Sequence, residues 1–202
     1  MSVRVFAALE LPPDLKRQLA EVQTGCQDLL AGDCVRWARP EGIHLTLKFY
    51  GEVPPEQVSE IETGLSRSAA SAAPIHVAVG GLGVFPDARR PQVIWTALEG
   101  ELSPLQRLQG AVEREAQALG FTPEARAFTP HLTLGRVRPG LKTAERERLI
   151  QVLTQLRAQA RAQARAQSLG DFSPGHLSLM RSELRAGGSV YTRLFAAALP
   201  AA

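Results

Sequence analysis

The tetrapeptide His-Leu-Thr-Leu occurs twice in this chain, at 44–47 and at 131–134, and each copy lies in a run that is typical of a β-strand. Side chains alternate between the two faces of a strand, so each copy directs its histidine and threonine to one face and its leucines to the other. The repetition therefore predicts a fold in which two strands, distant in the sequence, are built alike.

Strand-like and helix-like segments follow one another along the 202 residues. Runs of alternating polarity predict strands, and apolar residues three and four positions apart predict helices. Strands are predicted at 3–10, 34–39, 44–51, 75–79, 92–98, 131–134, 175–184 and 189–199, and helices at 13–29, 55–65, 105–119 and from 149 into 157–167. We also expect a glycine-rich bend at 80–83 and a turn at 186–188.

The connections beside the two signature strands, which carry the doubled motif, are short enough for hairpins. Antiparallel pairing with helices on the outside therefore fits better than a parallel sheet, and the predicted fold class is α+β. One motif in each half of the chain suggests two similar lobes, related by an approximate two-fold axis, with the signature strands meeting at the centre. We expect residues 1–202 to form one two-lobed domain with a helical extension at 157–167.

The composition is that of a globular chain, with 45% apolar residues and a net charge of +3, which permits a nucleic-acid partner without requiring one. The only cysteines, Cys26 and Cys34, are too few for a disulfide framework and wrongly spaced for a zinc ribbon, which favours a reducing cytoplasm. Residues 1–11 lack the unbroken apolar run of a signal peptide, and no stretch approaches the ~20 apolar residues of a membrane span. We expect a cytoplasmic protein that has no membrane partner.

The doubled motif points to proton transfer. An unperturbed imidazole titrates at about pH 6.5, so one histidine can take a proton from a nucleophile while the other gives one to a leaving oxygen. The hydroxyls of Thr46 and Thr133 can donate hydrogen bonds to anionic oxygens. Two such pairs facing each other would form a phosphate-cleaving site, with no need for a metal if hydrogen-bond donors neutralise the phosphoryl charge.

Arg136, three residues after Thr133, is a further candidate for phosphate binding. By simple alternation its side chain points to the opposite face, so a bulge or a strand end must redirect it. A zinc site is the weaker alternative, because it needs three or four converging ligands, and the other histidines, His76 and His176, lie beside no obvious ligand. We expect no metal and no cofactor.

On these residues the chain resembles the two-histidine phosphoesterases, in particular the bacterial and archaeal RNA 2′,3′-cyclic phosphodiesterases historically described as 2′-5′ RNA ligases. The resemblance spans nearly the whole chain. It is carried by 5–12, Trp37, 44–53, 83–86, 93–95, 128–136, 181–184, Gly188 and Tyr191.

The resemblance implies two lobes of antiparallel sheet with outer helices and an active-site groove between them. It also implies hydrolysis of an RNA 2′,3′-cyclic phosphate end to a 2′-phosphate, with His131 as the base that activates water and His44 as the acid that protonates the ribose 3′-oxygen. Thr46 and Thr133 would hold the phosphate oxygens. Phe49 matches an aromatic residue that can stack on the terminal base, and ordinary core packing is its alternative role. We expect RNA ends or cyclic nucleotides as substrates, and a monomer.

Two questions stay open at the level of the sequence. The same motif would serve a phosphodiesterase for cyclic dinucleotides, 2′-5′ oligonucleotides or ADP-ribose cyclic phosphate, and a non-catalytic RNA-binding module is an alternative of a different class. The arginines at 157, 161 and 165 share one helical face and form a basic stripe. We favour a solvated extension of the preceding helix over an RNA contact.

Overall fold

The computed structural model describes residues 2–30, 33–164, 168–185 and 188–202, with the backbone alone for 159–164. Two sheets form the centre of the molecule, and every strand pairing among these described residues is antiparallel. The first sheet has the order β3-β1-β8-β9 and the second the order β2-β6-β5-β4-β7. The strands are β1 (Val3–Glu10), β2 (Val35–Trp37), β3 (His44–Val53), β4 (Val77–Phe85), β5 (Val93–Glu99), β6 (His131–Val137), β7 (Gly170–Phe172), β8 (His176–Arg185) and β9 (Gly188–Ala198).

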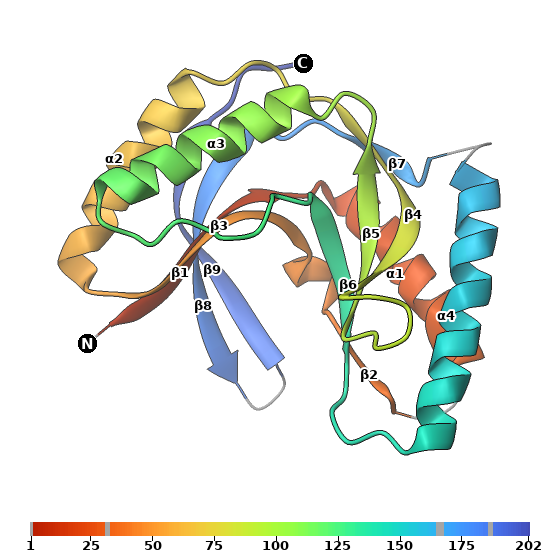
Figure 1. Cartoon of the computed structure of the whole chain (residues 1–202). Coiled ribbons are helices and arrows are strands. Elements are labelled where there is room, and N and C mark those ends of the chain that lie inside the picture. The colour runs from red at the N-terminus through yellow and green to blue at the C-terminus, as the bar shows by residue number, and fades with distance from the viewer. Residues whose placement is uncertain (1, 31–32, 165–167, 186–187) are drawn as a thin grey trace.

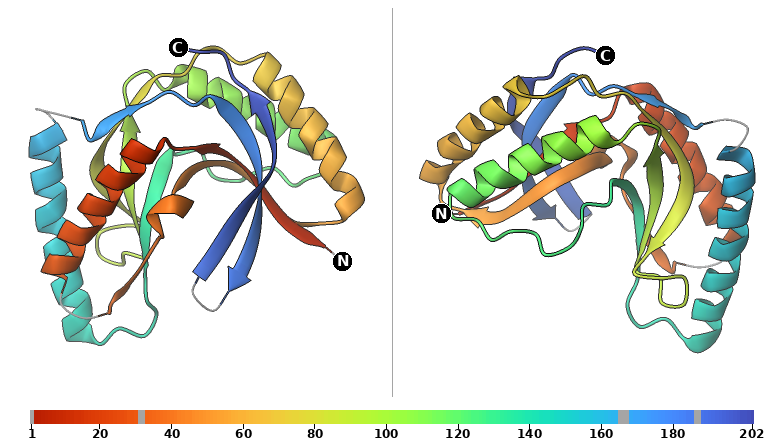
Figure 2. Two further views of the ribbon diagram at one scale, coloured as in Figure 1. Left: turned by 180° about the vertical axis from the view of Figure 1, so that it is seen from behind. Right: turned by 45° about the horizontal axis from the view of Figure 1, so that its top comes forward.

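Two helices cover each sheet (Figures 1 and 2). Helices α2 (Pro55–Ala70) and α3 (Ser103–Ala118) pack on the first sheet and complete the first lobe. Helices α1 (Pro13–Leu29) and α4 (Thr143–Ala164) lie on the outer side of the second sheet and complete the second lobe. Both α1 and α2 begin at a proline, which has no backbone N–H to leave unpaired in the first turn. The α+β class with two antiparallel sheets and outer helices is therefore confirmed.

The lobes are not two consecutive halves of the chain. Strand β1 pairs with both β3 and β8, so the first sheet joins the beginning of the chain to its end. The second sheet takes β2 from the first half and β4 to β7 from the middle and later part. The prediction that the signature strands meet at the centre is confirmed: β3 and β6 contact each other where the two lobes meet, and each belongs to a different sheet. The approximate two-fold axis stays a prediction.

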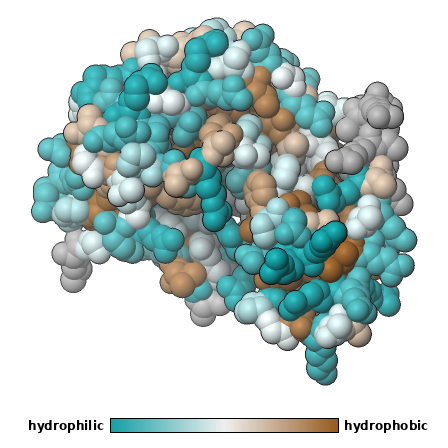
Figure 3. Space-filling view, viewed as in Figure 1, coloured by the Kyte–Doolittle hydropathy of each residue, from teal (hydrophilic) through white to brown (hydrophobic). Residues whose placement is uncertain are grey.

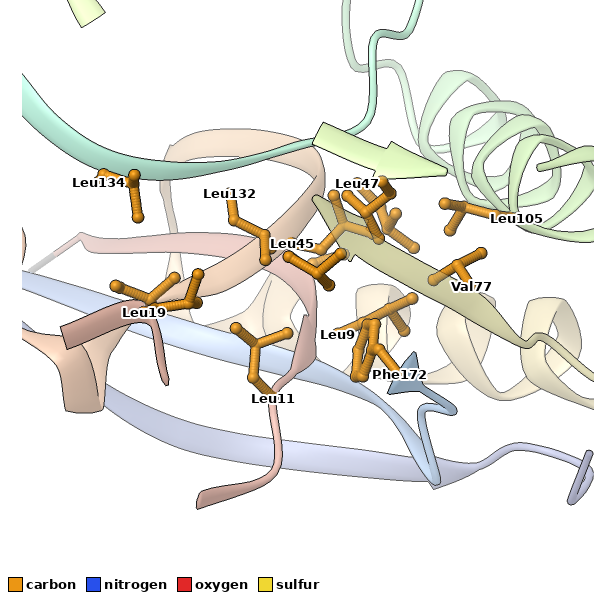
Figure 4. Close-up of a cluster of buried hydrophobic side chains, with 14 of the residues drawn as sticks. Leu9, Leu11, Leu19, Leu45, Leu47, Val77, Leu105, Leu132, Leu134 and Phe172 are labelled. Carbon is orange, nitrogen blue, oxygen red and sulfur yellow. The ribbon is translucent and has the colours of Figure 1, made fainter. Parts of the chain in front are cut away.

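The leucines of both motifs pack into one core that joins the two lobes. Leu45 and Leu47 of β3 and Leu132 and Leu134 of β6 are all buried in the same cluster, together with side chains from both sheets (Figure 4). The four leucines hold the signature strands back against this core. Each histidine and threonine must then face away from it.

Two segments differ from the sequence prediction, and two predicted segments lie outside the described residues. The glycine-rich bend predicted at 80–83 is part of β4, where the pairing with β5 shifts register between Gly80 and Gly83. Strand β7, of three residues, was not predicted, because so short a segment carries no periodicity. Residues 186–187 of the predicted turn and 165–167 of the predicted helical extension lie outside the described residues. No described helix combines the length and apolarity needed to cross a bilayer.

Candidate active site

Both signature strands carry a β-bulge at the same place in the motif. In the first sheet Thr46 lies opposite Ala8 and Lys48 opposite Ala7, so Leu47 is an extra residue in β3. In the second sheet Thr133 lies opposite Trp95 and Gly135 opposite Ile94, which leaves Leu134 as the extra residue in β6. A bulge of one residue reverses which face the following side chains occupy. The residue five positions after each histidine is thereby moved to the histidine's own face.

The neighbouring strands confirm this arrangement. Residues directly opposite each other in an antiparallel pair share a face, and β5 runs without a bulge beside β6. His131, Thr133 and Arg136 lie opposite Ala97, Trp95 and Val93, which alternate along β5 and therefore share one face. In the same way His44, Thr46 and Phe49 lie opposite Glu10, Ala8 and Phe6 of β1. The bulge that Arg136 needs in order to share the face of His131 is therefore present. Each signature strand presents three side chains on one face, which we call its motif face.

One hydrogen bond fixes each imidazole. Nδ1 of His44 lies 2.7 Å from the carbonyl oxygen of Gly42, and Nδ1 of His131 lies 2.8 Å from that of Thr129. A carbonyl only accepts, so each Nδ1 carries the proton and donates it. In the neutral ring the lone pair then sits on Nε2, which is the atom left for proton exchange. The two copies of the motif use the carbonyl two residues upstream in the same way.

Aromatic rings hold the two imidazoles from the side. The ring of Phe6 stacks on His44 at 4.6 Å between centroids, and Tyr191 meets that imidazole edge-on at 5.0 Å. Phe85 meets His131 edge-on at 5.0 Å, and Trp95 lies 6.0 Å from it. Such packing limits rotation of both imidazoles and partly excludes water from them.

The position of Trp95 depends on a glycine in the next strand. A Cβ atom at Gly83 would lie only 2.2 Å from the Trp95 ring, so any side chain there would displace the indole. The indole also stacks on Phe85 at 4.8 Å between centroids. Gly83 therefore allows the aromatic wall beside His131 to form.

Burial lowers the pKa of both imidazoles below the ordinary value of histidine, because a charged ring loses hydration. The hydrogen bond to the backbone carbonyl opposes this effect in each case. The nearby charges then differ: Lys16 lowers and Glu10 raises the pKa of His44, whereas His131 has Arg136, which lowers its pKa. His44 has a carboxylate opposite it on the neighbouring strand, and His131 has the side chain of Ala97 instead.

A pocket of about 450 Å³ opens beside His44, between β3 and the β8–β9 hairpin. Its walls include Tyr191, Lys16 and Arg193, and also the carboxylates of Glu10 and Glu41. Arg193 pairs with Glu10 at 3.2 Å, and Ser178 donates a hydrogen bond of 2.7 Å to the same carboxylate. The pocket thus has mixed charge and an aromatic wall, which suits a polar, largely uncharged group such as a nucleoside.

Comparison with known proteins agrees with this geometry. The family model described as "LigT like Phosphoesterase" matches residues 9–95 and 99–191. The chain belongs to this family. A protein of Methanothermobacter thermautotrophicus named RNA 2′,3′-cyclic phosphodiesterase is 31% identical over 193 residues, which are 95% of this chain and 96% of that protein. A Thermus thermophilus protein of the same name is 31% identical over 197 residues, which are 95% of this chain and 88% of that protein.

Solved structures show the same LigT-like fold. The crystal structure of TT0787 from Thermus thermophilus superposes with a TM-score of 0.73 at 25% identity and covers 98% of each chain. The crystal structure of E. coli LigT complexed with 3′-AMP superposes with a TM-score of 0.73 at 20% identity, over 98% of each chain, which supports the fold alone.

The LigT-like architecture accounts for most of the candidates from the sequence. His44, Thr46 and Phe49 share one motif face, and His131 and Thr133 share the other with Arg136. The side chain of Phe49 is 61% exposed and its ring centroid lies 5.6 Å from that of Phe6, so core packing is not its role. The roles of these residues in binding and catalysis remain predictions.

Other candidates lie elsewhere or stay untested in this LigT-like chain. His76 contacts Ser173 at 2.9 Å, and His176 is exposed at the start of β8. Within the described residues, no three His, Cys, Asp or Glu side chains gather as metal ligands would. Helix α4 reaches Ala164, but the side chains of Arg161 and Arg165 lie outside the described part, so the basic stripe stays a prediction.

Several residues around the site were missed as site residues in the sequence prediction. Phe6, Tyr191, Phe85 and Trp95 contact the imidazoles, and Glu10 faces His44. All of them lie on or beside strands that the sequence predicts, but they come from two sheets: Phe6, Glu10 and Tyr191 from the first, and Phe85 and Trp95 from the second. The sequence did not show which strands pair with β3 and β6, and that pairing brings these residues to the imidazoles.

Proposed function

We propose that this LigT-like phosphoesterase hydrolyses the 2′,3′-cyclic phosphate at RNA ends to a 2′-phosphate, with His44 and His131 as its proton-transfer groups. The observation that carries the proposal is the matched pair of motif faces, each with an imidazole fixed through Nδ1 and a threonine hydroxyl beside it. The names of its relatives, which share about 30% of its residues, support the choice of substrate. A monomeric state and a cytoplasmic location stay predictions.

In the proposed reaction His131 acts as the base and His44 as the acid. Nε2 of His131 takes a proton from water as the water oxygen attacks phosphorus. The bond from phosphorus to the ribose 3′-oxygen breaks, and protonated Nε2 of His44 gives its proton to that oxygen. The nearby charges do not distinguish the two rings, because Lys16 lowers the pKa of His44 more than Glu10 raises it, and Arg136 lowers the pKa of His131. The division of roles therefore rests on the resemblance to the family.

The remaining side chains of the motif faces would bind the substrate. Thr46 and Thr133 would donate hydrogen bonds to the phosphoryl oxygens, where negative charge increases during attack. The exposed ring of Phe49 would stack on the terminal base, a contact that tolerates any base and contributes about 1–3 kcal/mol. These assignments need no bound metal, because the hydroxyls and Arg136 supply hydrogen-bond donors and positive charge.

The direct test is incubation of the purified protein with adenosine 2′,3′-cyclic phosphate in the presence of a chelator. We expect a nucleoside 2′-phosphate as the product. A 3′-phosphate, or turnover only after metal is added, would overturn the mechanism. No turnover of this substrate together with turnover of a cyclic dinucleotide, a 2′-5′ oligonucleotide or ADP-ribose cyclic phosphate would move the protein to a related phosphodiesterase. Binding without turnover would make it a non-catalytic module.

The pH dependence of kcat/KM follows from the lowered pKa values of the two imidazoles. The active form needs one protonated and one neutral ring, and burial makes each ring lose its proton below the ordinary pH of about 6.5. We therefore expect kcat/KM to be greatest below about pH 6.5 and to fall roughly tenfold per pH unit well above it. The maximum for kcat should lie at higher pH, since the bound phosphate stabilises both charged rings. A kcat/KM maximum at or above about pH 7.5 would contradict this account.

A further inference from the structure

A second pocket of about 450 Å³ lies at the other end of β6, between the β4–β5 connection and the start of α4. Four arginines line it, Arg90, Arg136, Arg138 and Arg146, and none of the described residues in its walls is an aspartate or a glutamate. We call it the arginine pocket. In Figure 3 hydrophilic side chains cover this end of the second lobe around a small apolar area. A hollow that gathers four like charges costs electrostatic energy unless an anion occupies it.

Three of the four guanidinium groups are available to a ligand. Arg138 pairs with Asp33 at 2.8 Å. Arg90, Arg136 and Arg146 are exposed, and none of them forms an ion pair with a carboxylate in the described part of the chain.

Two carboxylates close in sequence to the pocket arginines are already engaged. Asp87 accepts hydrogen bonds from the backbone N–H groups of Arg89 and Arg90, at 2.8 and 3.1 Å. Glu145 accepts one of 2.8 Å from the backbone N–H of Lys142. Neither carboxylate lines the arginine pocket, and neither forms an ion pair with one of its arginines in the described part of the chain.

Arg136 connects the arginine pocket to the catalytic site. It shares the motif face of β6 with His131 and also lines the pocket. From His131 to Arg136 the bulged strand runs beside four residue steps of β5, from Ala97 to Val93, which at about 3.3 Å per residue is roughly 13 Å. Arg36 of β2 lies directly opposite Arg136 and is exposed on the same face, without an ion pair among the described residues. Like charges opposite each other in a sheet are unfavourable, which again indicates an anionic ligand.

The pocket beside His44 is a poorer path for a polyanion. Its walls carry Glu10 and Glu41 as well as Lys16, Arg39 and Arg193, so two carboxylates partly offset its positive charge, whereas the arginine pocket has no carboxylate among its described wall residues. An RNA strand whose cyclic end lies between the imidazoles must leave the site in one direction. The charges favour the direction of the arginine pocket.

We propose that the arginine pocket, extended by Arg36, is a second subsite that binds the phosphodiesters immediately upstream of the cyclic end. This inference rests on the proposed function. It makes the enzyme selective for the end of an RNA strand over a cyclic mononucleotide, which has no further phosphate to place there. Arginine suits the task because its planar fork can bind two phosphate oxygens at once.

The test compares two substrates and two variants. The substrates are adenosine 2′,3′-cyclic phosphate and a short oligoribonucleotide that ends in a 2′,3′-cyclic phosphate. The test variant is the double substitution Arg90→Gln and Arg146→Gln, which leaves Arg136 in place. The control is Arg107→Gln, which removes one exposed charge from α3 of the first lobe, outside the arginine pocket, and so measures the effect of one general charge. Binding of a labelled oligoribonucleotide ending in a 2′-phosphate gives a second readout.

We expect the wild-type protein to favour the oligoribonucleotide in kcat/KM. In the double variant the ratio of kcat/KM for the oligoribonucleotide to that for the mononucleotide should fall about tenfold, mainly through KM. The slope of log(kcat/KM) against log[salt] should become shallower by about 1.4 for the oligoribonucleotide, since each lost phosphate contact contributes ~0.7 for a single strand. Arg107→Gln should leave both quantities near their wild-type values.

The alternatives give distinct results. An unchanged ratio in the double variant, or an equal loss on both substrates, would overturn the subsite while leaving the proposed function intact. Equal effects of the double variant and of Arg107→Gln would indicate long-range attraction and not a subsite. If addition of a 5′-phosphate to the mononucleotide restores the whole preference, the pocket recognises a single free phosphate and not a strand. If the wild-type protein turns over neither substrate, the proposed function fails and the subsite fails with it.

Discussion

Replacing either His44 or His131 by alanine is expected to lower hydrolysis of a 2′,3′-cyclic nucleotide at least about 10²-fold, because each ring performs one of the two proton transfers. The loss should be found in kcat, since the threonines, Arg136 and Phe49 still bind the substrate. The double variant should be little worse than the weaker single variant, because groups that act as a unit are not additive. Steady-state kinetics in the presence of a chelator measure all three.

The chain contains its own controls for this experiment. His176→Ala and His76→Ala each remove an imidazole outside the two motif faces, and both should keep near wild-type activity. Thermal unfolding of each variant separates lost chemistry from lost folding. Near wild-type turnover in a well-folded His44→Ala or His131→Ala protein would show that the ring concerned transfers no proton.

The largest expected loss of stability from breaking an ion pair concerns Lys48. The bulge that turns Phe49 outward also turns Lys48 inward, where its side chain is only 5% exposed. Its Nζ donates hydrogen bonds of 2.8 Å to Glu113 and 2.9 Å to the carbonyl oxygen of Thr122. Burial alone would raise the pKa of Glu113, yet its pKa lies below the ordinary value, mainly because Lys48 and the backbone N–H of Glu124 bind the carboxylate.

Lys48→Met should therefore lower the free energy of unfolding by about 2–3 kcal/mol, less than the roughly 3–5 kcal/mol of a fully buried pair, because Glu113 keeps some contact with water. The matched control is Arg67→Met, which breaks the pair of Arg67 with Glu115 on the same helix α3. That arginine side chain is 57% exposed, and the change should have a much smaller effect. Urea unfolding measures the free energy of unfolding of both variants. A Lys48→Met protein as stable as the Arg67→Met protein would contradict the role of the buried pair.

The fold and the centre of the site were largely predictable from the sequence. Period-two alternation alone placed His44 with Thr46 and His131 with Thr133, and it placed the leucines on the opposite face. The structure adds that this opposite face is buried in the core cluster. Proline at the first helical position located α1 and α2 closely. These features depend on local geometry, which a sequence records directly.

The parts that could not be predicted depend on pairing between distant strands. The bulges at Leu47 and Leu134 follow from how β3 meets β1 and β6 meets β5, and nothing in the two leucines marks them. Simple alternation therefore placed Arg136 on the face opposite to His131, and only the bulge brings it to the same face. The same holds for the arginine pocket, which brings the β4–β5 connection at Arg90 next to the distant segment that runs from Arg136 to Arg146.

A crystal structure of the protein with a bound nucleoside 2′-phosphate tests most directly whether two distant histidines act on one phosphorus atom. We expect the phosphate oxygens to lie within hydrogen-bond distance, about 2.6–3.2 Å, of Nε2 of His44 and of Nε2 of His131 in the same complex. A phosphate that contacts only one imidazole, with the other turned toward solvent, would contradict the account.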